Sequence, residues 1–231
     1  MKTLKYWSGP LLVVAMALVL NSCISLGGGG LAPQEDETSR GLKEALTIGT
    51  ANAVADVSRP DGYYRNPLIR ISMPESVQKV EKALRFVGYG RQLDDFEMSM
   101  NRAAERAAPA AKSMFWDAIK QIRFADAWQI LTGRENEATL YLKDKTYTPL
   151  ETAFQPIVHS TMSEVGVTRR YQEIENKVRS IPFTDMIEFD LDQYVTEKAL
   201  DGLFLMLAEE ERKIREDPVA RVTELLRKVF G

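Results

Sequence analysis

Apolar residues recur at helical spacing along nearly the whole chain after Thr38, and no stretch there alternates steadily between apolar and polar residues. Spacing of three and four residues puts side chains on one face of a helix, whereas alternation would indicate a strand. The pattern therefore predicts an all-α fold. We expect residues 39–231 to form a single compact bundle of roughly eight to ten helices around one core.

Glycine, proline and acidic residues mark where the predicted helices begin and end. The expected helices cover residues 40–57, 72–87, 91–108, 109–122, 124–131, 136–165 and 167–180, then one after Asp190 and a last one from Pro218. We expect a break near residues 146–149 and a kink at Pro156. The charged segment 209–216 is expected to be solvated.

The first 22 residues follow a different pattern. Lys2 and Lys5 give a positive start, and residues 11–20 form an uninterrupted apolar run. As a helix this run would be only about 15 Å long, roughly half the thickness of the hydrocarbon core of a bilayer. Residues 1–22 are therefore predicted to be an export signal rather than a permanent membrane span.

The apolar run ends in Leu20-Asn21-Ser22-Cys23, which resembles the lipobox of bacterial lipoproteins, although the usual second residue is small or β-branched. The resemblance implies that a diacylglycerol is attached to the thiol of Cys23 and that cleavage leaves this residue first. Ile24 in the next position implies the outer membrane, facing the periplasm. The alternative is an ordinary signal peptide and a soluble periplasmic protein.

A lipid is a physically reasonable role for Cys23, because a lone cysteine cannot form an internal disulfide. Each buried methylene group contributes about 0.8 kcal/mol, so two or three acyl chains would hold the protein on a membrane. Residues 23–38 contain four consecutive glycines and then an acidic run, which predicts a flexible tether. Its root-mean-square reach is roughly 20 Å.

Charge and composition limit the kinds of partner and binding site that this chain is expected to have. Removing residues 1–22 takes away Lys2 and Lys5 and no acid, so the formal charge changes from −3 to −5, which argues against nucleic acid as a partner. The single histidine, His159, is expected to be structural or solvent-exposed. Asp190 and Asp192 are explained by helix capping. No cofactor or metal site is predicted.

The connection over residues 58–71 holds the strongest candidate binding residues. Pro60-Asp61-Gly62 has the residue types of a tight turn, so this segment is expected to be non-helical. Its tyrosines and arginines could stack on a partner and pair with anions, or the tyrosines could fill the core while the arginines cap helix ends. The candidate residues are Arg59, Asp61, Tyr63, Tyr64, Arg65 and Arg70.

Asp201 lies within residues 199–208, which are apolar nearly all round and predict the central helix. A carboxylate buried there would need a partner. We expect Asp201 to pair with Arg169 or with an arginine of the 58–71 connection, and so to pin the central helix to its neighbour.

Several strings resemble a bacterial domain-of-unknown-function family, number 4197, of exported helical proteins. They are Gly-Leu-Lys-Glu-Ala-Leu (41–46), Arg-Pro-Asp-Gly-Tyr-Tyr (59–64), Gly-Val-Thr-Arg (166–169), Lys-Ala-Leu-Asp-Gly-Leu-Phe (198–204) and Leu-Leu-Arg-Lys-Val-Phe-Gly (225–231). The resemblance covers almost all of residues 38–231. It implies a helical fold and export, and no reaction, ligand or catalytic residue.

These observations favour a binding or envelope-organising module without enzymatic activity, anchored in the membrane through Cys23. Its partner would be another envelope protein or a cell-wall component. The alternative is a carboxylate-dependent hydrolase or lyase acting on cell-wall glycan. Glu75-Ser76 is similar to the catalytic start of lytic transglycosylases, but the downstream motif is missing and a capping box from Ser72 to Glu75 also explains this glutamate.

Overall fold

The computed structural model describes residues 37–164, 190–220, 222–224 and 227. All of these belong to one compact unit, residues 35–231. The described residues form helices and connections, with no β-strand among them. Cys23, nearly all of the predicted tether, the predicted helix 167–180 and Arg169 lie outside the described residues.

The α-helices are α1 (Glu37–Ser58), α2 (Glu75–Leu84), α3 (Gly90–Ala107), α4 (Ala111–Lys120), α5 (Phe124–Thr132), α6 (Glu137–Glu164) and α8 (Leu191–Glu216). A π-helix (Arg85–Tyr89) joins α2 to α3, and two 3₁₀ helices (Ala108–Ala110 and Pro218–Ala220) follow α3 and α8. The all-α fold is confirmed, but this part of the chain holds fewer helices than the eight to ten expected.

Helix α6 continues through both Pro149 and Pro156. The expected break near residues 146–149 is wrong. Both prolines lie on the exposed side of the helix, whereas Leu150, Phe154 and Val158 are buried on the other side. Water can solvate the carbonyl groups left without an amide partner on the exposed side, so packing of the buried side keeps the helix continuous.

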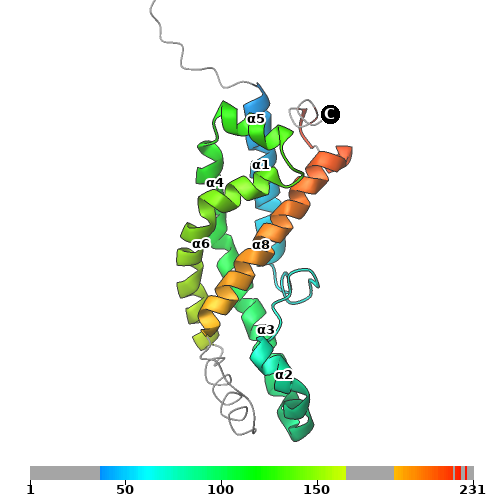
Figure 1. Ribbon diagram of the computed structural model, residues 1–231, viewed down its shortest axis with the longest axis vertical. Coiled ribbons are helices and arrows are strands. Elements are labelled where there is room, and N and C mark those ends of the chain that lie inside the picture. Colours follow the sequence, from blue (N-terminus) through cyan, green and yellow to red (C-terminus); the bar gives the residue numbers. More distant parts are fainter. Residues whose placement is uncertain (1–36, 165–189, 221, 225–226, 228–231) are drawn as a thin grey trace, which may run out of the picture. The chain divides into compact units, whose positions relative to one another are not determined.

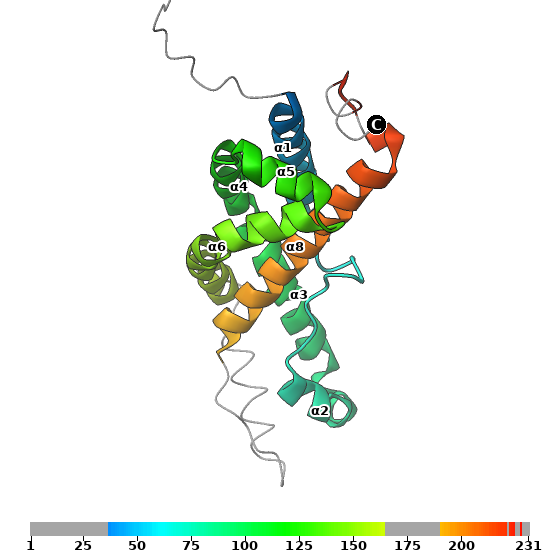
Figure 2. The ribbon, with the colours of Figure 1, turned by 45° about the horizontal axis from the view of Figure 1, so that its top comes forward.

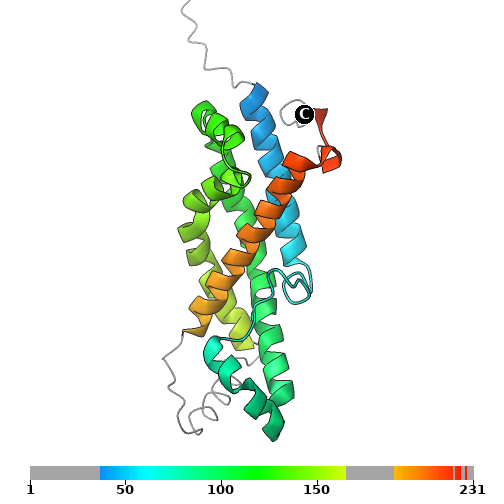
Figure 3. The ribbon, with the colours of Figure 1, turned by 45° about the vertical axis from the view of Figure 1, so that its right-hand side comes forward.

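Helix α8 is the central element of this unit, as the sequence predicts. It packs against α6, α1 and α3 (Figure 1), and views from two further directions show it crossing all three (Figures 2 and 3). The Phe204 ring of α8 lies 5.8 Å from that of Phe115, edge to face, and 6.2 Å from that of Tyr147, stacked. None of the described helices is long and apolar enough to cross a bilayer.

The expectation that residues 209–216 are solvated is wrong for two glutamates, Glu210 and Glu211, which are buried. The Glu211 carboxylate accepts hydrogen bonds from the backbone N–H groups of Ala138 and Thr139 at 3.0 and 2.8 Å. These N–H groups have no partner within α6 because they belong to its first turn. Arg215 binds the same carboxylate at 2.9 Å and donates to the carbonyl of Ile130. One ion pair on α8 thus satisfies the adjoining ends of α5 and α6.

We predict that Glu211→Ala lowers the free energy of unfolding by about 3 kcal/mol, because it leaves Arg215 and two backbone N–H groups without their buried partner. Glu209→Ala is the matched control, since Glu209 pairs with Arg212 at a more exposed position and should change stability by less than about 1 kcal/mol. Urea unfolding monitored by circular dichroism measures both. Equal losses in the two variants would contradict the capping role of Glu211.

Candidate functional site

The connection from α1 to α2 begins with the predicted turn. Asp61 has a left-handed backbone (φ 68°), and the Gly62 N–H donates to the carbonyl of Arg59 at 2.9 Å. A Cβ atom on Gly62 would lie 2.5 Å from the carbonyl oxygen of Asp56 and 2.6 Å from that of Val57. Only glycine allows the turn to pack this closely against the end of α1.

Tyr63 is fully buried beneath this turn. Its hydroxyl donates to the Ala199 carbonyl of α8 at 2.7 Å, and Glu105 Oε1 on α3 accepts from the N–H groups of Tyr63 and Tyr64 at 3.1 and 3.3 Å. Burial, and secondarily the charge of Glu105, raise the pKa of Tyr63 far above its ordinary value. Tyr63 therefore belongs to the core, in agreement with the structural interpretation of the connection and against a binding role for this residue.

Asp61 is committed to a charge network that holds the connection on α3. Arg102 donates to Asp61 Oδ1 and to Glu105 Oε2, both at 2.6 Å, and Arg65 Nε lies 3.0 Å from Asp61 Oδ2. Arg59 is exposed, and its guanidinium lies 3.8 Å from Asp56. The arginines of the connection thus pair with carboxylates, so the expectation that they cap helix ends is wrong.

Where the connection approaches α2, an arginine stacks on a tyrosine ring at the surface. Arg70 donates to both carboxylate oxygens of Glu97 at 3.0 and 3.1 Å, and its guanidinium lies 4.6 Å above the ring of half-buried Tyr64. The bond to Glu97 raises the pKa of Arg70. The Asn101 side chain binds both the N–H and the carbonyl of Ile71 at 2.8 Å. Residues 70 and 71 are therefore fixed to α3 through side chains and backbone.

A groove of about 370 Å³ runs between this end of the connection and α8, and we call it the loop–α8 groove. Its walls include Leu68, Arg70, Ser72, Tyr194, Lys198, Asp201 and Leu205. Leu68 is 64% exposed and Leu205 41% exposed, with charged side chains beside them. The structure thus brings Arg70 and Asp201, two residues predicted separately, into one groove.

The sequence prediction for Asp201 is wrong. Its side chain is 54% exposed rather than buried, and its partner is Lys143 of α6 at 3.9 Å rather than an arginine. Leu200, Leu203 and Phe204 are buried, whereas Asp201 and Leu205 lie on the solvent side of α8. The helix is apolar all round in this segment, but only one side of it is covered, so Asp201 needs no buried partner.

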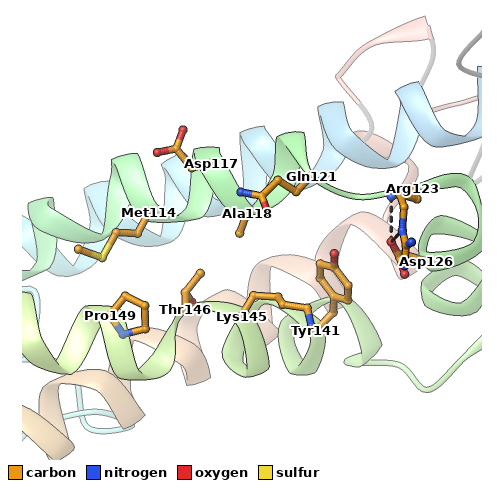
Figure 4. Close-up of a pocket in the computed structure, with 10 residues that line it drawn as sticks. All are labelled: Met114, Asp117, Ala118, Gln121, Arg123, Asp126, Tyr141, Lys145, Thr146 and Pro149. Atoms are coloured by element: carbon orange, nitrogen blue, oxygen red, sulfur yellow. Dashed lines mark hydrogen bonds and ion pairs between the residues drawn. The ribbon is translucent and has the colours of Figure 1, made fainter. Parts of the chain in front are cut away.

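A second groove, of about 520 Å³, lies between α4 and α6 and ends at the start of α5 (Figure 4), and we call it the α4–α6 groove. The Asp126 carboxylate at this end accepts from the Arg123 N–H at 2.9 Å and lies 3.4 Å from Arg123 Nε. The backbone hydrogen bond is the main cause that lowers the pKa of Asp126. Sequence reasoning missed this groove because its residues come from three segments without a shared motif.

The remaining candidate acids have structural positions. Asp190 is the N-cap of α8 and accepts from the Gln193 N–H at 2.9 Å, as predicted. Asp192, also expected to cap the helix, lies in its first turn, and its Oδ2 is 2.6 Å from Nδ1 of exposed His159. Within the described residues no three histidine, cysteine, aspartate or glutamate side chains are grouped so that they could hold a metal ion.

The predicted capping box at the start of α2 is wrong. Helix α2 begins at Glu75, its N-cap is Pro74, and no side chain caps it. The residue before a proline is disfavoured from helical torsions, which moves the start of the helix past Ser72.

Residues 32–231 match the family model described as "Protein of unknown function (DUF4197)". Comparison with curated proteins and with solved structures gives no match.

We predict that Tyr63→Phe changes how stability depends on pH. The folded-state pKa of Tyr63 is raised, so its contribution is complete below the ordinary tyrosine pKa and is lost as the pH rises above about 10. In the wild-type protein this residue should lower stability by about 1.4 kcal/mol per pH unit in that range. Tyr63→Phe should lose about 1 kcal/mol at neutral pH, from the hydrogen bond to Ala199, and should show a shallower alkaline decline.

Urea unfolding from about pH 8 to about pH 11 measures both effects. Tyr64→Phe is the control, because Tyr64 is only half-buried and its replacement should keep the wild-type slope. A Tyr63→Phe variant that declines as steeply as wild type would show that this hydroxyl is not sequestered in the core.

Proposed function

We propose that this chain, which belongs to the DUF4197 family of proteins of unknown function, is a lipid-anchored binding module of the bacterial envelope. In this proposal the loop–α8 groove binds an extended segment of another envelope protein. The observation that carries it is the exposure of Leu68 and Leu205 beside Arg70, Lys198 and Asp201 in one groove. Apolar side chains flanked by charges on a rigid surface are typical of protein-binding sites.

The backbone of the connection supports an extended partner. Neither the Arg70 carbonyl nor the Ser72 N–H has a hydrogen-bond partner within the described residues. These two groups are two residues apart, the spacing at which an extended chain can hydrogen-bond to an added strand. Because Asn101 holds Ile71 between them at 2.8 Å, this edge is ordered before a partner arrives, which reduces the entropy lost on binding.

The Asp126 carboxylate of the α4–α6 groove favours binding over glycan hydrolysis. A glycosidase needs one carboxylic acid whose pKa is raised so that it can protonate the leaving group. The pKa of Asp126 is lowered instead, because its carboxylate accepts hydrogen bonds from Arg123. The Asp201 side chain is half-exposed, and its ionic partner is the Lys143 ammonium at 3.9 Å.

The anchor follows from the sequence around Cys23. A lipid on this residue, with cleavage after Ser22, would tie the helical unit to the periplasmic face of the outer membrane through the segment that precedes α1. Confinement near the membrane raises the effective concentration of the groove toward other envelope proteins. A weak contact through an open groove would then suffice for binding.

We predict that a photo-crosslinking amino acid in place of Leu205 gives one discrete crosslinked protein in intact cells, joined through a single contiguous segment. Leu68→Asp should reduce the yield of this product at least tenfold, because it puts a charge in the apolar part of the groove. The control probe replaces Val87, which is as exposed as Leu68 but lies in the π-helix between α2 and α3. The same product from position 87, or no effect of Leu68→Asp, would refute the groove as the binding site.

We predict that radiolabelled fatty acid attaches to the wild-type protein and that the protein fractionates with outer membranes. Cys23→Ser should carry no label and should leave the membrane fraction, because serine offers no thiol for acylation. A wild-type protein without label would instead support the soluble periplasmic alternative.

A further inference from the structure

We propose that the α4–α6 groove is a second, separate binding site, and that its ligand is a short peptide with a free C-terminal carboxylate. Its volume of about 520 Å³ lies within the range of small-ligand sites. The groove is open, and acidic, basic and apolar side chains line it (Figure 4).

Arg123 supplies the carboxylate-binding group. Its side chain is 84% exposed, and Nε is the only guanidinium nitrogen with a partner among the described residues, Asp126 at 3.4 Å. The bond through Nε holds the guanidinium at the end of the groove, and both terminal nitrogens keep their N–H donors. Two parallel N–H donors match the two oxygens of a carboxylate. Asp126, whose pKa is lowered by the Arg123 backbone N–H, remains charged and keeps Arg123 in place.

Helix α6, on the opposite side of the groove from α4, supplies a backbone acceptor. Pro149 is inside α6 and has no N–H to donate to the carbonyl of Lys145, four residues earlier. Lys145 and Pro149 both line the groove (Figure 4), so this carbonyl belongs to a residue that lines it. A carbonyl without a helical partner accepts a hydrogen bond from an amide N–H, the donor that recurs along a peptide.

The rest of the lining suits the other parts of a peptide. The Gln121 amide has no side-chain hydrogen bond in the described structure and offers both a donor and an acceptor. Met114, Ala118 and the exposed ring of Pro149 form an apolar surface for small side chains. Asp117 lies on the α4 side, with its carboxylate directed away from α6 (Figure 4) and 3.7 Å from Lys120 Nζ.

The test uses the full chain purified in detergent and two probes, trialanine and trialanine amide, which differ only at the carboxylate. Isothermal titration calorimetry should show binding of trialanine and at least tenfold weaker binding of the amide. Arg123→Gln should weaken trialanine at least tenfold and remove the difference between the probes. Arg134→Gln is the matched control, since Arg134 also pairs with an acid three residues later, Glu137, but lies outside the groove.

A second variant separates binding from folding. Pro149→Ala restores an N–H that can bond to the Lys145 carbonyl, so it should raise the melting temperature while weakening trialanine binding severalfold. Leu68→Asp should leave trialanine binding unchanged, which keeps this result distinct from the loop–α8 groove. The proposal is overturned if trialanine does not bind, if its amide binds equally well, or if Arg123→Gln or Pro149→Ala leaves the affinity unchanged.

Discussion

The buried carboxylate of Glu105 sets the path of the connection from α1 to α2, and this connection forms one wall of the loop–α8 groove. A buried charge is costly unless its hydrogen bonds are satisfied, and Glu105 is satisfied by two consecutive backbone N–H groups and by Arg102. These bonds fix the connection from α1 to α2 against α3. Tyr63 then enters the core and reaches α8, and the later residues of the connection follow a defined path to Arg70. The connection can form one wall of the loop–α8 groove because its other side is fixed to α3 by these hydrogen bonds.

Glu211, near the C-terminal end of α8, likewise holds a distant segment in place, here the start of α6. Both glutamates accept from two backbone N–H groups that lack partners in their own segment, and both bind an arginine of their own helix, Arg102 or Arg215. In both places a glutamate from a distant part of the chain satisfies the backbone N–H groups. These long-range contacts also make the position of each element depend on the presence of a distant one, which favours a single packed arrangement.

The two grooves differ in what they can bind. The loop–α8 groove has exposed leucines and two backbone groups, the Arg70 carbonyl and the Ser72 N–H, without a hydrogen-bond partner among the described residues, features that suit a segment of a protein. The α4–α6 groove has a guanidinium held through Nε and a helix carbonyl that lacks the usual amide donor four residues later, features that suit the end of a small polar ligand. The two grooves are formed by different residues, so both could be occupied at once under the proposed tethering through Cys23.

The sequence by itself determined the helical fold, most helix limits, the turn at residues 60–62, the N-cap Asp190, the family, and the lipid-attachment prediction at Cys23. These features rest on interactions within a few residues, such as apolar periodicity, turn torsions and capping. Only the tertiary structure decided that Tyr63 points inward, that Asp201 faces solvent and that Glu211 is buried. Those outcomes depend on partners far along the chain, 42 residues away for Tyr63 and Glu105 and 73 for Ala138 and Glu211. A helical pattern shows that one side of a helix is apolar, but which neighbour covers each residue is set by how the helices pack.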